Sequence, residues 1–360
     1  MKGKRVLVAD WLDLYGGAEK VITILDEIIN FDEVYTLTDI RKPEDKHLFF
    51  KGNPKIHSTK LQVFGKYFRY LLPLFPYFVK QIKIDPNSKF IFSSSHNIAK
   101  GISKTSADQI HYSYIQSRNL KYIWDDEQID LYFGKFKFLI LPFVKYLQKY
   151  DVQSAQKPDL LIANSLFQKQ WLWDHYHRDS VVIYPPVDLS TYQLYTQKED
   201  YYVAVGRFAK MKRFDILIDA FNQMPDKKLI LIGDGELNDQ FRKTAKSNIQ
   251  FTGFLNSDKV YEYVKKAKAA IYIGIEDFGI AAVEAQACGT PVIAIGNGGT
   301  AETILHKKTG ILVENQNVTS LIKSVEEFES HQFDYEYISK HSQKFSKKEF
   351  INSITNLLSV

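Results

Sequence analysis

Residues 269–292 have the sequence AAIYIGIEDFGIAAVEAQACGTPV, in which an apolar run, a loop, a helical pattern and a second apolar run follow one another. The run Ala269–Ile273 is typical of a buried strand, and a helix is expected to start near Phe278. Gly289-Thr-Pro291 then ends this helix and starts the next buried strand. A strand, a helix and a strand in this order predict a βαβ unit with parallel strands that are buried on both faces.

The same alternation extends over the whole chain. Short apolar runs recur between amphipathic stretches, at Arg5–Ala9, Val34–Leu37, Phe90–Phe92, Leu160–Ala163, Val181–Tyr184, Tyr201–Val205, Leu229–Ile232, Val292–Ile295 and Gly310–Val313. Two such series predict an α/β fold of two doubly wound, Rossmann-like domains facing each other across a cleft. Pro185-Pro186 can continue neither a strand nor a helix, which puts the hinge near residues 185–200. We expect an N-terminal domain over 1–185, a C-terminal domain over 186–335 and a helical segment over 336–360. This segment can pack on either domain, including back on the N-terminal one.

Composition excludes several classes of protein. The 360 residues are 45% hydrophobic and 25% charged, which excludes a peptide, a disordered chain and a coiled coil. A net charge of +5 with 14% aromatic residues suits nucleic acid, an anionic lipid surface or a phosphorylated ligand, and charge alone leaves these open. Cys288 is the single cysteine, so a disulfide framework is excluded. We expect no signal peptide, and no apolar run approaches the roughly 18 residues that span a membrane.

The loop and helix after Ile273 form a candidate phosphate site. Open α/β sheets bind ligands outside the carboxyl ends of their strands, and a helix N-terminus directs unsatisfied N–H groups and a positive dipole there. Glu276 precedes the helix, and Glu284 lies between one and two turns inside it. Carboxylates accept hydrogen bonds from paired hydroxyls, so one suits a sugar and the other a ribose beside a diphosphate. The alternative is an ordinary helix with two surface glutamates.

Two cations follow the first strand of the second half, in Gly206-Arg207-Phe-Ala-Lys-Met-Lys212. Arg207 and Lys212 can converge on one anion at a strand end, and the arginine fork matches phosphate oxygens. A solvated basic turn is the alternative. Gly233-Asp-Gly235 follows another strand and is a weak signal as a lone motif.

Together these motifs resemble family 4 retaining glycosyltransferases of the GT-B fold. The likeness rests on the Glu-x7-Glu spacing of Glu276 and Glu284, on Glu-Ala-x-Ala-x-Gly-x-Pro-Val after it, and on Gly-Arg-x4-Lys before it. It implies that Arg207 and Lys212 hold the donor diphosphate and help to neutralise the leaving group. It also implies that Glu276 positions the donor sugar and that Glu284 binds the ribose. Arg213 is a departure, since family members commonly have Gly at that position.

The resemblance implies a donor-binding set spread over both halves. It comprises Gly16, Gly17, Gly206, Gly233, Gly235, Phe254, Asp277, Phe278, Gly279, Ile280 and Glu284. Gly16-Gly17 follow the first strand, where the absence of side chains lets a ligand approach the backbone. They are not part of a Gly-x-Gly-x-x-Gly fingerprint, which argues against a dehydrogenase. Phe254 lies in a segment that resembles the one near the nucleobase and is equally compatible with a plain core strand and turn.

The first half resembles a sub-branch of bacterial polysaccharide and glycolipid mannosyltransferases. The likeness rests on Ser93-Ser-Ser-His96, on His111-Tyr-Ser-Tyr-Ile-Gln116 and on Tyr122-Ile-Trp124-Asp125. The branch has an active-site histidine at the position of Gln116, whose amide can hydrogen-bond a sugar but cannot become charged. A purely structural role is the alternative for His96 and, more strongly, for His111. The catalytic set implied is Glu276, Arg207, Lys212, His96 and Gln116.

Residues 60–84 and 133–150 combine aromatic and basic side chains and contain no acidic residue. This composition suits the headgroup layer of an anionic membrane. The alternative is that the aromatic side chains belong to the core, and Pro73 and Pro76 exclude a long continuous amphipathic helix.

The resemblance therefore implies a hexosyltransferase that retains anomeric configuration and needs no metal or other cofactor. The expected donor is GDP-mannose or a UDP-sugar, and the expected acceptor is a glycan or a lipid-linked glycan of a bacterial cell-surface polysaccharide or glycolipid. We expect no nucleic-acid partner, and a cytoplasmic location that includes the inner face of the cell membrane. A non-catalytic sugar-nucleotide-binding or partner subunit is the main alternative. An epimerase lacks this Glu-x7-Glu helix, and a phosphorylase needs a far longer chain.

Overall fold

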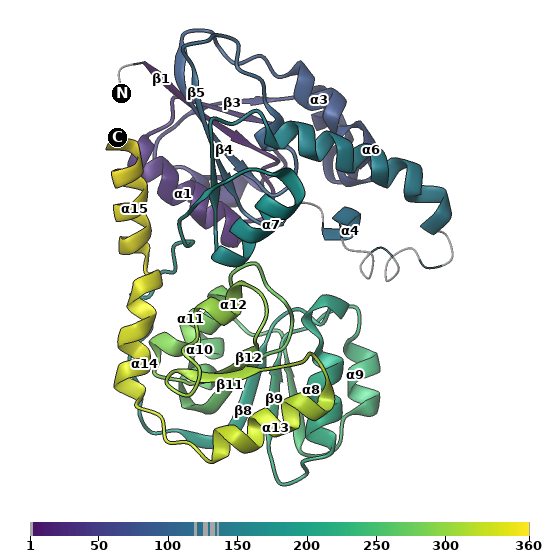
Figure 1. The fold of residues 1–360 in the computed structure, drawn as a ribbon, viewed down its shortest axis with the longest axis vertical. Helices are drawn as coiled ribbons and strands as arrows, with labels where there is room; N and C mark the ends of the chain where they lie inside the picture. The colour runs from purple at the N-terminus through teal and green to yellow at the C-terminus, as the bar shows by residue number, and fades with distance from the viewer. Residues whose placement is uncertain (1–2, 119–120, 125–128, 130–133, 135–136, 360) are drawn as a thin grey trace. The chain divides into compact units, whose positions relative to one another are not determined.

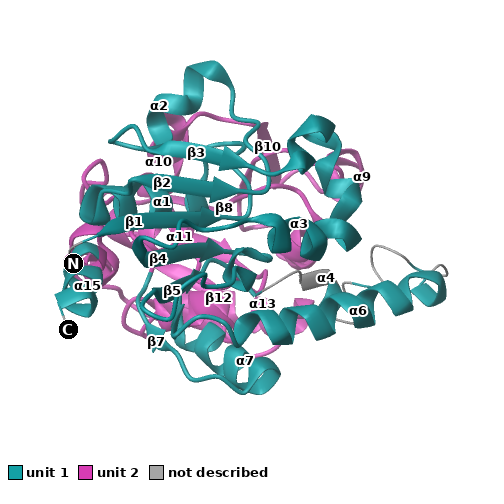
Figure 2. Ribbon diagram, turned by 90° about the horizontal axis from the view of Figure 1, so that it is seen from above, with its two compact units in different colours: residues 1–184, 351–360 teal, residues 185–350 magenta. Residues whose placement is uncertain are grey.

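The computed structural model describes residues 3–359 except 119–120, 125–128, 130–133 and 135–136. The chain divides into two compact units, which Figure 2 colours separately. Unit 1 comprises Met1–Tyr184 and Ile351–Val360, and unit 2 comprises Pro185–Phe350. The division falls at the Pro185-Pro186 pair, and most of the C-terminal segment groups with unit 2.

Unit 1 contains a parallel sheet with the strand order β3-β2-β1-β4-β5-β6-β7 in the part of the chain that the structure describes (Figure 1). Its strands are β1 (Lys4–Ala9), β2 (Glu33–Thr36), β3 (Lys55–Ser58), β4 (Ser88–Ser95), β5 (Ile110–Ile115), β6 (Leu160–Ala163) and β7 (Val181–Val182). Its α-helices are α1 (Gly17–Ile29), α2 (Lys46–Phe49), α3 (Phe75–Gln81), α4 (Lys121–Trp124), α6 (Lys137–Ala155) and α7 (Leu166–Tyr176). Its 3-10 segments are η1 (Pro43–Asp45), η2 (Lys60–Leu74) and η3 (Ala99–Gly101).

Unit 2 contains a second parallel sheet, with the strand order β10-β9-β8-β11-β12-β13. Its strands are β8 (Glu199–Val205), β9 (Leu229–Ile232), β10 (Ile249–Gly253), β11 (Ala267–Tyr272), β12 (Val292–Ile295) and β13 (Gly310–Val313). Its helices are η5 (Lys210–Lys212), α8 (Phe214–Asn222), α9 (Asn238–Thr244), α10 (Ser257–Lys266), α11 (Ile280–Ala287), α12 (Gly299–Glu302), α13 (Val318–Glu329), α14 (Tyr335–Ser342) and η6 (Gln343–Phe345). The final helix, α15 (Lys347–Ser359), begins in unit 2 and ends in unit 1.

The prediction of two doubly wound parallel sheets is confirmed. In unit 2, Leu229 and Leu231 of β9 contact one buried cluster, whereas Ile230 and Ile232 contact the cluster on the other face of the sheet. Helices therefore cover both faces, which explains why these strands are continuous apolar runs rather than alternating ones. Three strands, β3, β5 and β10, are absent from the predicted runs. β3 (Lys55-Ile-His-Ser58) is a partly exposed edge strand with a mixed sequence, and β5 and β10 also contain polar residues among their apolar ones.

The strand orders fix where ligands can bind. In unit 1 the chain runs outward from β1 to β3 and returns to β4, on the other side of β1. In unit 2 it runs from β8 to β10 and returns to β11, beside β8. Such a reversal opens a crevice at the carboxyl ends of the two central strands, because their loops lead to opposite sides of the sheet. The loops after β1 and β4, and those after β8 and β11, are therefore the expected sites.

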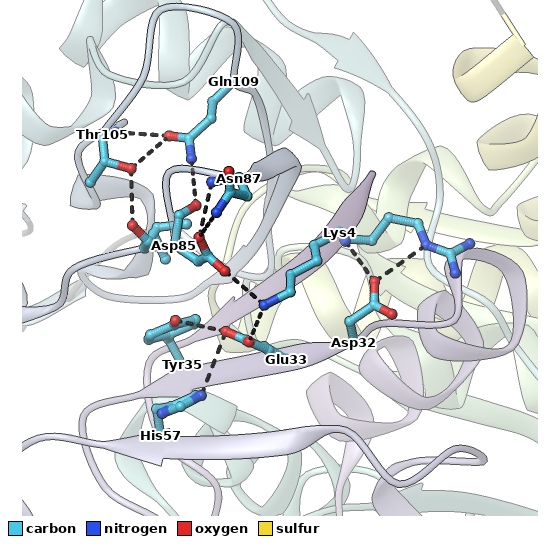
Figure 3. A network of polar contacts seen from close by, with 11 residues as sticks. Lys4, Asp32, Glu33, Tyr35, His57, Asp85, Asn87, Thr105 and Gln109 are labelled. Carbon is cyan, nitrogen blue, oxygen red and sulfur yellow. Dashed lines mark hydrogen bonds and ion pairs between the residues drawn. The ribbon is translucent and has the colours of Figure 1, made fainter. Parts of the chain in front are cut away.

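Charged side chains join the opposite, amino end of the unit 1 sheet, as Figure 3 shows. The Lys4 amino group of β1 donates to Asp85 at 2.7 Å and to Glu33 of β2 at 3.1 Å. The hydroxyl of Tyr35 donates to Glu33 at 2.8 Å, and His57 of β3 lies 3.6 Å from the same carboxylate. The hydrogen bond from Lys4 lowers the pKa of Asp85. This network joins β1, β2 and β3 at the end of the sheet remote from the predicted site.

Candidate functional site

The loops after β8 and β11 are held together by the close approach of backbone to glycine. A Cβ atom on Gly274 would lie 2.7 Å from the carbonyl oxygen of Met211, so the η5 turn packs directly against the end of β11. A Cβ atom on Gly299 would lie 1.9 Å from the carbonyl oxygen of Asp277, and the N–H of Gly299 donates to the backbone carbonyl oxygen of Glu276 at 2.8 Å. Glycine at 274 and 299 therefore lets three loops meet at one point.

This packing brings together two of the predicted catalytic residues. The Lys212 amino group donates to the Glu276 carboxylate, although the two residues are 64 positions apart in the chain. Both side chains are partly exposed, 34% for Lys212 and 28% for Glu276. An anionic ligand at this point can therefore take over Lys212 and release the Glu276 carboxylate to accept other hydrogen bonds.

Arg207 lies on the same loop, with its side chain exposed. The adjacent Phe208 is fully buried and packs edge-on against Phe214, with ring centroids 4.8 Å apart, so it anchors the loop. Arg213 has φ of +54°, the left-handed conformation that favours glycine. Its guanidinium bonds the Asp215 carboxylate at 3.0 to 3.2 Å. The loop thus keeps, with an arginine, the turn that a glycine would make most easily.

The N-terminus of α11 has a glycine at the capping position. Gly279 has φ of +94° and provides no capping side chain, whereas Asn256 and Asn317 cap α10 and α13 with their side-chain oxygens. The first N–H groups of α11 are therefore available to an anion. Asp277 and Phe278 are buried, at 7% and 4% exposure, so their side chains form part of the packing below the loop. The helix begins at Ile280, two residues later than expected.

Glu284 lies within α11 and shares its surroundings with two tyrosines that sequence analysis did not single out. Burial, together with the Glu284 carboxylate that its hydroxyl contacts, raises the pKa of Tyr192. The hydroxyl of Tyr272 in β11 donates to the carbonyl oxygen of Ala281 at 3.2 Å. No local motif marks Tyr192, because it lies in the polar stretch after the Pro-Pro pair and comes close to Glu284 only through folding.

Gly233 and Gly235 have a packing role of their own. A Cβ atom on Gly233 would lie 1.9 Å from the carbonyl oxygen of Gly206, and one on Gly235 would lie 2.6 Å from that of Phe208. These glycines let the loop after β9 lie against the loop after β8, where the Gly206 N–H donates to Ile232 at 3.0 Å. They therefore support the Arg207 loop.

Phe254 follows β10 and is 82% exposed. It is preceded by Gly253, which has φ of +73° and whose carbonyl oxygen accepts a hydrogen bond from the Gly233 N–H at 3.0 Å. An exposed ring at the carboxyl end of an edge strand can stack on a planar ligand. The segment thus contains the strand and turn of the alternative interpretation, with Phe251 packed against the core, whereas Phe254 itself lies outside the core.

In unit 1, the crevice between β1 and β4 is organised by Asp10. Its buried carboxylate accepts four hydrogen bonds of 2.6 to 2.8 Å from the backbone N–H groups of residues 96–99. The His96 ring lies 3.5 Å from the same carboxylate and packs edge-on against Trp11, at 4.5 Å between centroids. His96 is thereby held at the carboxyl end of the sheet.

Gln116 follows β5 and lies beside the start of α1. Its amide nitrogen donates to the Ser94 hydroxyl at 2.8 Å and to the carbonyl oxygen of Ala18 at 3.4 Å. Gly16 caps α1 from the other side, since its N–H donates to the Glu19 carboxylate at 3.1 Å. The predicted residues Gly16, Gly17 and Gln116 therefore lie in one place, and Glu19 is a residue there that sequence analysis missed.

Two further histidine and tryptophan positions have structural roles. His111 is fully buried in β5, bonds the Ser93 hydroxyl at 2.8 Å, and burial lowers its pKa to about 3. It therefore fits the structural alternative. The Trp124 indole donates to the buried Asp151 carboxylate at 2.8 Å, and the neighbouring Asp125 lies outside the described residues.

Within the described part of the chain, no group of three or more His, Cys, Asp or Glu side chains is placed to hold a metal ion. No helix there is both long and apolar enough to span a bilayer. A cavity of about 370 Å³ lies at the amino ends of β8 and β9, whereas the Lys212–Glu276 pair lies beyond the carboxyl ends of the strands. It is lined by Glu199, Tyr201, Lys228, Ile230, Gln250, Glu262, Tyr263 and Lys266.

Comparison with known proteins adds two kinds of likeness, one of sequence and one of fold. Residues 193–348 match the family described as glycosyl transferases group 1. A glycosyltransferase of Methanocaldococcus jannaschii is 30% identical over 210 residues, which cover 57% of this chain and 58% of that relative. The chain therefore matches less than two thirds of the length of this relative.

Two solved structures resemble both units. A lipopolysaccharide outer core galactosyltransferase superposes with a TM-score of 0.70 at 15% identity, over 99% of each chain. HepE of Anabaena, crystallised with UDP and glucose, superposes with a TM-score of 0.67 at 18% identity, again over 99% of each chain. At these identities the likeness is one of fold.

Proposed function

We propose that the chain transfers a hexosyl unit from a nucleoside-diphosphate sugar, because residues 193–348 match the family described as glycosyl transferases group 1 and the chain has the GT-B fold. The transfer retains anomeric configuration. The donor is GDP-mannose or a UDP-sugar, and the acceptor is a glycan or a lipid-linked glycan in the synthesis of cell-surface polysaccharide or glycolipid. The observation that carries the proposal is the pairing of Lys212 with Glu276 beside the N-terminus of α11.

The diphosphate of the donor is assigned to the α11 N-terminus, Lys212 and Arg207. Two cations and a helix dipole stabilise the charges of the bound diphosphate and the further negative charge that develops on it as the bond to the sugar breaks, which is the kind of stabilisation that dominates such steps. When the diphosphate takes over Lys212, the Glu276 carboxylate becomes free to accept hydrogen bonds from the donor sugar. HepE was crystallised with UDP and glucose, which supports a nucleotide-sugar donor here.

The nucleoside is assigned to the region between Glu284 and Phe254. The Glu284 carboxylate accepts hydrogen bonds from the ribose hydroxyls, and Tyr192 orients that carboxylate. The exposed Phe254 ring and the backbone after β10 lie along the base, and Gly233 and Gly235 keep the intervening loop thin.

In the proposed reaction the bond between the sugar C1 and the phosphate oxygen breaks, and the electron pair leaves with the diphosphate. The acceptor oxygen bonds to C1 on the same face and passes its proton to a donor phosphate oxygen. This route requires no metal, because Arg207, Lys212 and the helix N-terminus supply the positive charge. Removal of divalent cations with EDTA should leave the rate unchanged.

We assign the unit 1 crevice to the acceptor. His96 and Gln116 orient the acceptor hydroxyl by hydrogen bonds, and Gly16 and Gly17 let it approach the backbone of α1. We place the enzyme in the cytoplasm, including the inner face of the cell membrane.

A second candidate is a sugar-nucleotide-binding or partner subunit without transferase activity. Gln116 favours it, because its amide nitrogen is bonded to Ser94 and Ala18 and cannot take up a proton. Such a subunit would bind the donor but neither hydrolyse nor transfer it.

The deciding experiment is a panel of UDP-glucose, UDP-galactose, UDP-N-acetylglucosamine and GDP-mannose. Thermal stabilisation by one donor, followed by release of its nucleoside diphosphate, supports a transferase. The Glu276→Ala variant should still be stabilised but release little product, whereas Glu314→Ala, at an exposed glutamate, should behave as the wild type. Stabilisation without product release in the wild type supports the subunit, and no stabilisation by any donor contradicts both candidates.

A further inference from the structure

Exposed hydrophobic side chains are concentrated on one region of unit 1. More than half of the large hydrophobic side chains that are exposed in the described part of the chain lie between residues 63 and 77 or between 138 and 146. They are Val63, Phe64, Tyr67, Tyr70, Leu74, Tyr77, Phe138, Leu139, Phe143 and Tyr146. Singly exposed apolar residues are normal, but such a concentration marks an interaction site.

The two segments pack against each other below these side chains. Leu72 of η2 contacts the buried cluster that contains Val144 and Leu147 of α6. Tyr150 of α6 belongs in turn to the cluster that contains Phe68 and Phe75. α3 and α6 also lie near each other in both views (Figure 1, Figure 2). The exposed side chains of residues 60–83 and 137–149 therefore belong to two segments that pack together, and we call them the aromatic-basic surface.

Buried and exposed aromatics alternate along η2 and α3. Phe68, Phe75 and Phe78 point into the core, with exposures of 0%, 1% and 8%, whereas Tyr70 and Tyr77 are exposed by 84% and 61%. The core interpretation of this stretch is thus right for one set of rings and wrong for the other. A segment that needed rings only for its core would not place the others in water.

The charge of the aromatic-basic surface has one sign. Its sequence contains no Asp or Glu, and its exposed cations are Lys60, Lys66, Arg69, Lys80, Lys83, Lys145 and Lys149. Arg69 bonds the Asp13 carboxylate at 2.6 Å, so the lysines carry most of the net charge. A surface with this charge attracts an anionic partner.

The arrangement of side chains favours a bilayer over a folded partner. Tyrosine and lysine are the side chains that settle at the headgroup level of membranes, with the ring or the aliphatic stem toward the acyl chains and the polar tip in water. Gly65 has φ of +48°, and Pro73 lies inside the segment. η2 is therefore kinked and is not one continuous amphipathic helix with a single apolar face. We infer that the aromatic-basic surface binds an anionic lipid bilayer, with its rings among the headgroups. A lipid-linked acceptor, as in the proposed function, would reside in such a bilayer. Binding of the bilayer itself does not depend on the transfer reaction.

The test is flotation of the full chain with vesicles of phosphatidylglycerol and phosphatidylcholine, against vesicles of phosphatidylcholine alone. Wild-type protein should float with the anionic vesicles at low salt and be released at high salt. Lys80→Glu and Lys145→Glu should each weaken binding by about fivefold or more, since each replaces one cation near the surface with an anion. Tyr70→Ser and Phe143→Ser should weaken it at every salt concentration.

Matched controls are Lys308→Glu and Tyr337→Ser, at exposed positions of unit 2. Absence of wild-type flotation at low salt would overturn the inference, as would equal losses in the control variants. Self-association that Tyr70→Ser and Phe143→Ser abolish, without flotation, would instead assign this surface to a second copy of the chain.

The outcome can be separated from that of the proposed function. Stabilisation by a nucleotide sugar is also measured on the Lys80, Tyr70, Phe143 and Lys145 variants. It should be unchanged, because these four residues lie in unit 1, whereas the Lys212–Glu276 pair lies in unit 2. Failure of every donor to stabilise the wild type would contradict the proposed function and leave the flotation result standing.

Discussion

At the residue scale, the contact between Lys212 and Glu276 makes the two charges interdependent. The Lys212 amino group and the Glu276 carboxylate form an ion pair with each other, so both charges have a partner before substrate binds. A diphosphate must replace Glu276 as the partner of Lys212, and the cost of separating the ion pair is offset by the stronger charge of the phosphate. Glu276 is thereby directed toward the sugar only when the donor is bound.

The two glutamates of the site should separate kinetically. Glu276→Ala removes a contact to the reacting sugar and should lower kcat by about 100-fold with little change in nucleotide affinity. Glu284→Ala removes hydrogen bonds between a carboxylate and ribose and should weaken nucleotide binding by roughly tenfold or more, with a smaller effect on kcat. Steady-state kinetics and isothermal titration of the nucleoside diphosphate measure both. Unchanged constants in both variants would contradict the site assignment.

His111 should make the protein sensitive to mild acid. Burial lowers its pKa from the usual 6.5 to about 3. Between pH 6.5 and pH 3, the unfolded chain therefore binds a proton at this histidine that the folded chain does not. Stability is therefore complete above pH 6.5 and falls as the pH is lowered, by about 1.4 kcal/mol per unit. Relative to wild type, His111→Gln should gain about 2 kcal/mol between pH 6.5 and 5.

Urea unfolding at a series of pH values measures this effect. His47→Gln, at an exposed histidine, is the matched control and should leave the pH dependence as in the wild type. Parallel curves for wild type and His111→Gln would show that His111 does not titrate between these values, against the prediction.

At the element scale, loops between strands and helices are positioned by glycines that admit another backbone. The η5 turn can place Lys212 beside Glu276 only because residue 274 has no side chain. The loop after β9 supports the Arg207 loop in the same way, through Gly233 and Gly235. The site thus depends on elements whose own residues do not touch the proposed substrate.

Gly274→Ala tests this dependence. The new Cβ would lie 2.7 Å from the Met211 carbonyl oxygen, so the η5 turn must move away from β11 and take Lys212 with it. We expect a loss of about 1 to 3 kcal/mol in unfolding free energy, as for other overpacked sites. Donor affinity should fall as well, measured by titration of the nucleoside diphosphate.

The matched control is Gly52→Ala, where the nearest atom would lie 3.4 Å away, at the end of the Asn30 side chain. It should leave both stability and donor affinity unchanged. A Gly274→Ala variant with normal donor affinity would separate Lys212 from the diphosphate site and contradict its assignment.

At the scale of the whole molecule, each unit has its own hydrophobic core, and unit 1 also has a buried polar cluster. In unit 1 the buried Asp151 carboxylate accepts hydrogen bonds from Lys100 of η3, Trp124 of α4 and Tyr176 of α7, at 2.5 to 2.8 Å. This cluster joins three elements to α6. The proposed donor site lies mostly in unit 2, so stability and ligand binding should respond separately.

Calorimetry of the whole chain should reveal this separation. Asp151→Ala leaves the buried Lys100 without its carboxylate and should destabilise unit 1 by roughly 3 to 5 kcal/mol. A nucleoside diphosphate at 100 times its Kd should stabilise the transition of unit 2 by about 2.7 kcal/mol. Asp108→Ala, which removes an exposed ion pair with Lys89, is the control and should change neither transition. A single transition shifted equally by both changes would contradict independent units.

Several features of the fold and of the candidate site could be predicted from single stretches of sequence. The ten apolar runs all overlap strands, because a strand buried on both faces needs a continuous apolar run whatever its neighbours are. Glu276 and Lys212 could be named as site residues because each lies just after a predicted strand. Edge strand β3 could not be predicted, because a partly exposed edge leaves no comparable pattern in Lys55–Ser58.

By itself, the sequence determined the fold class, the alternation of strands and helices in both halves, and the position of the loops that follow the strands bearing the candidate site. These properties depend on local hydrophobic pattern and on glycine and proline, so they can be inferred without knowing which segments meet. Only the tertiary structure decided that Lys212 pairs with Glu276, that Tyr192 contacts Glu284, and which rings of residues 60–84 face water. Each of these contacts joins residues far apart in the chain, and the strand order that joins them is not encoded in any one stretch.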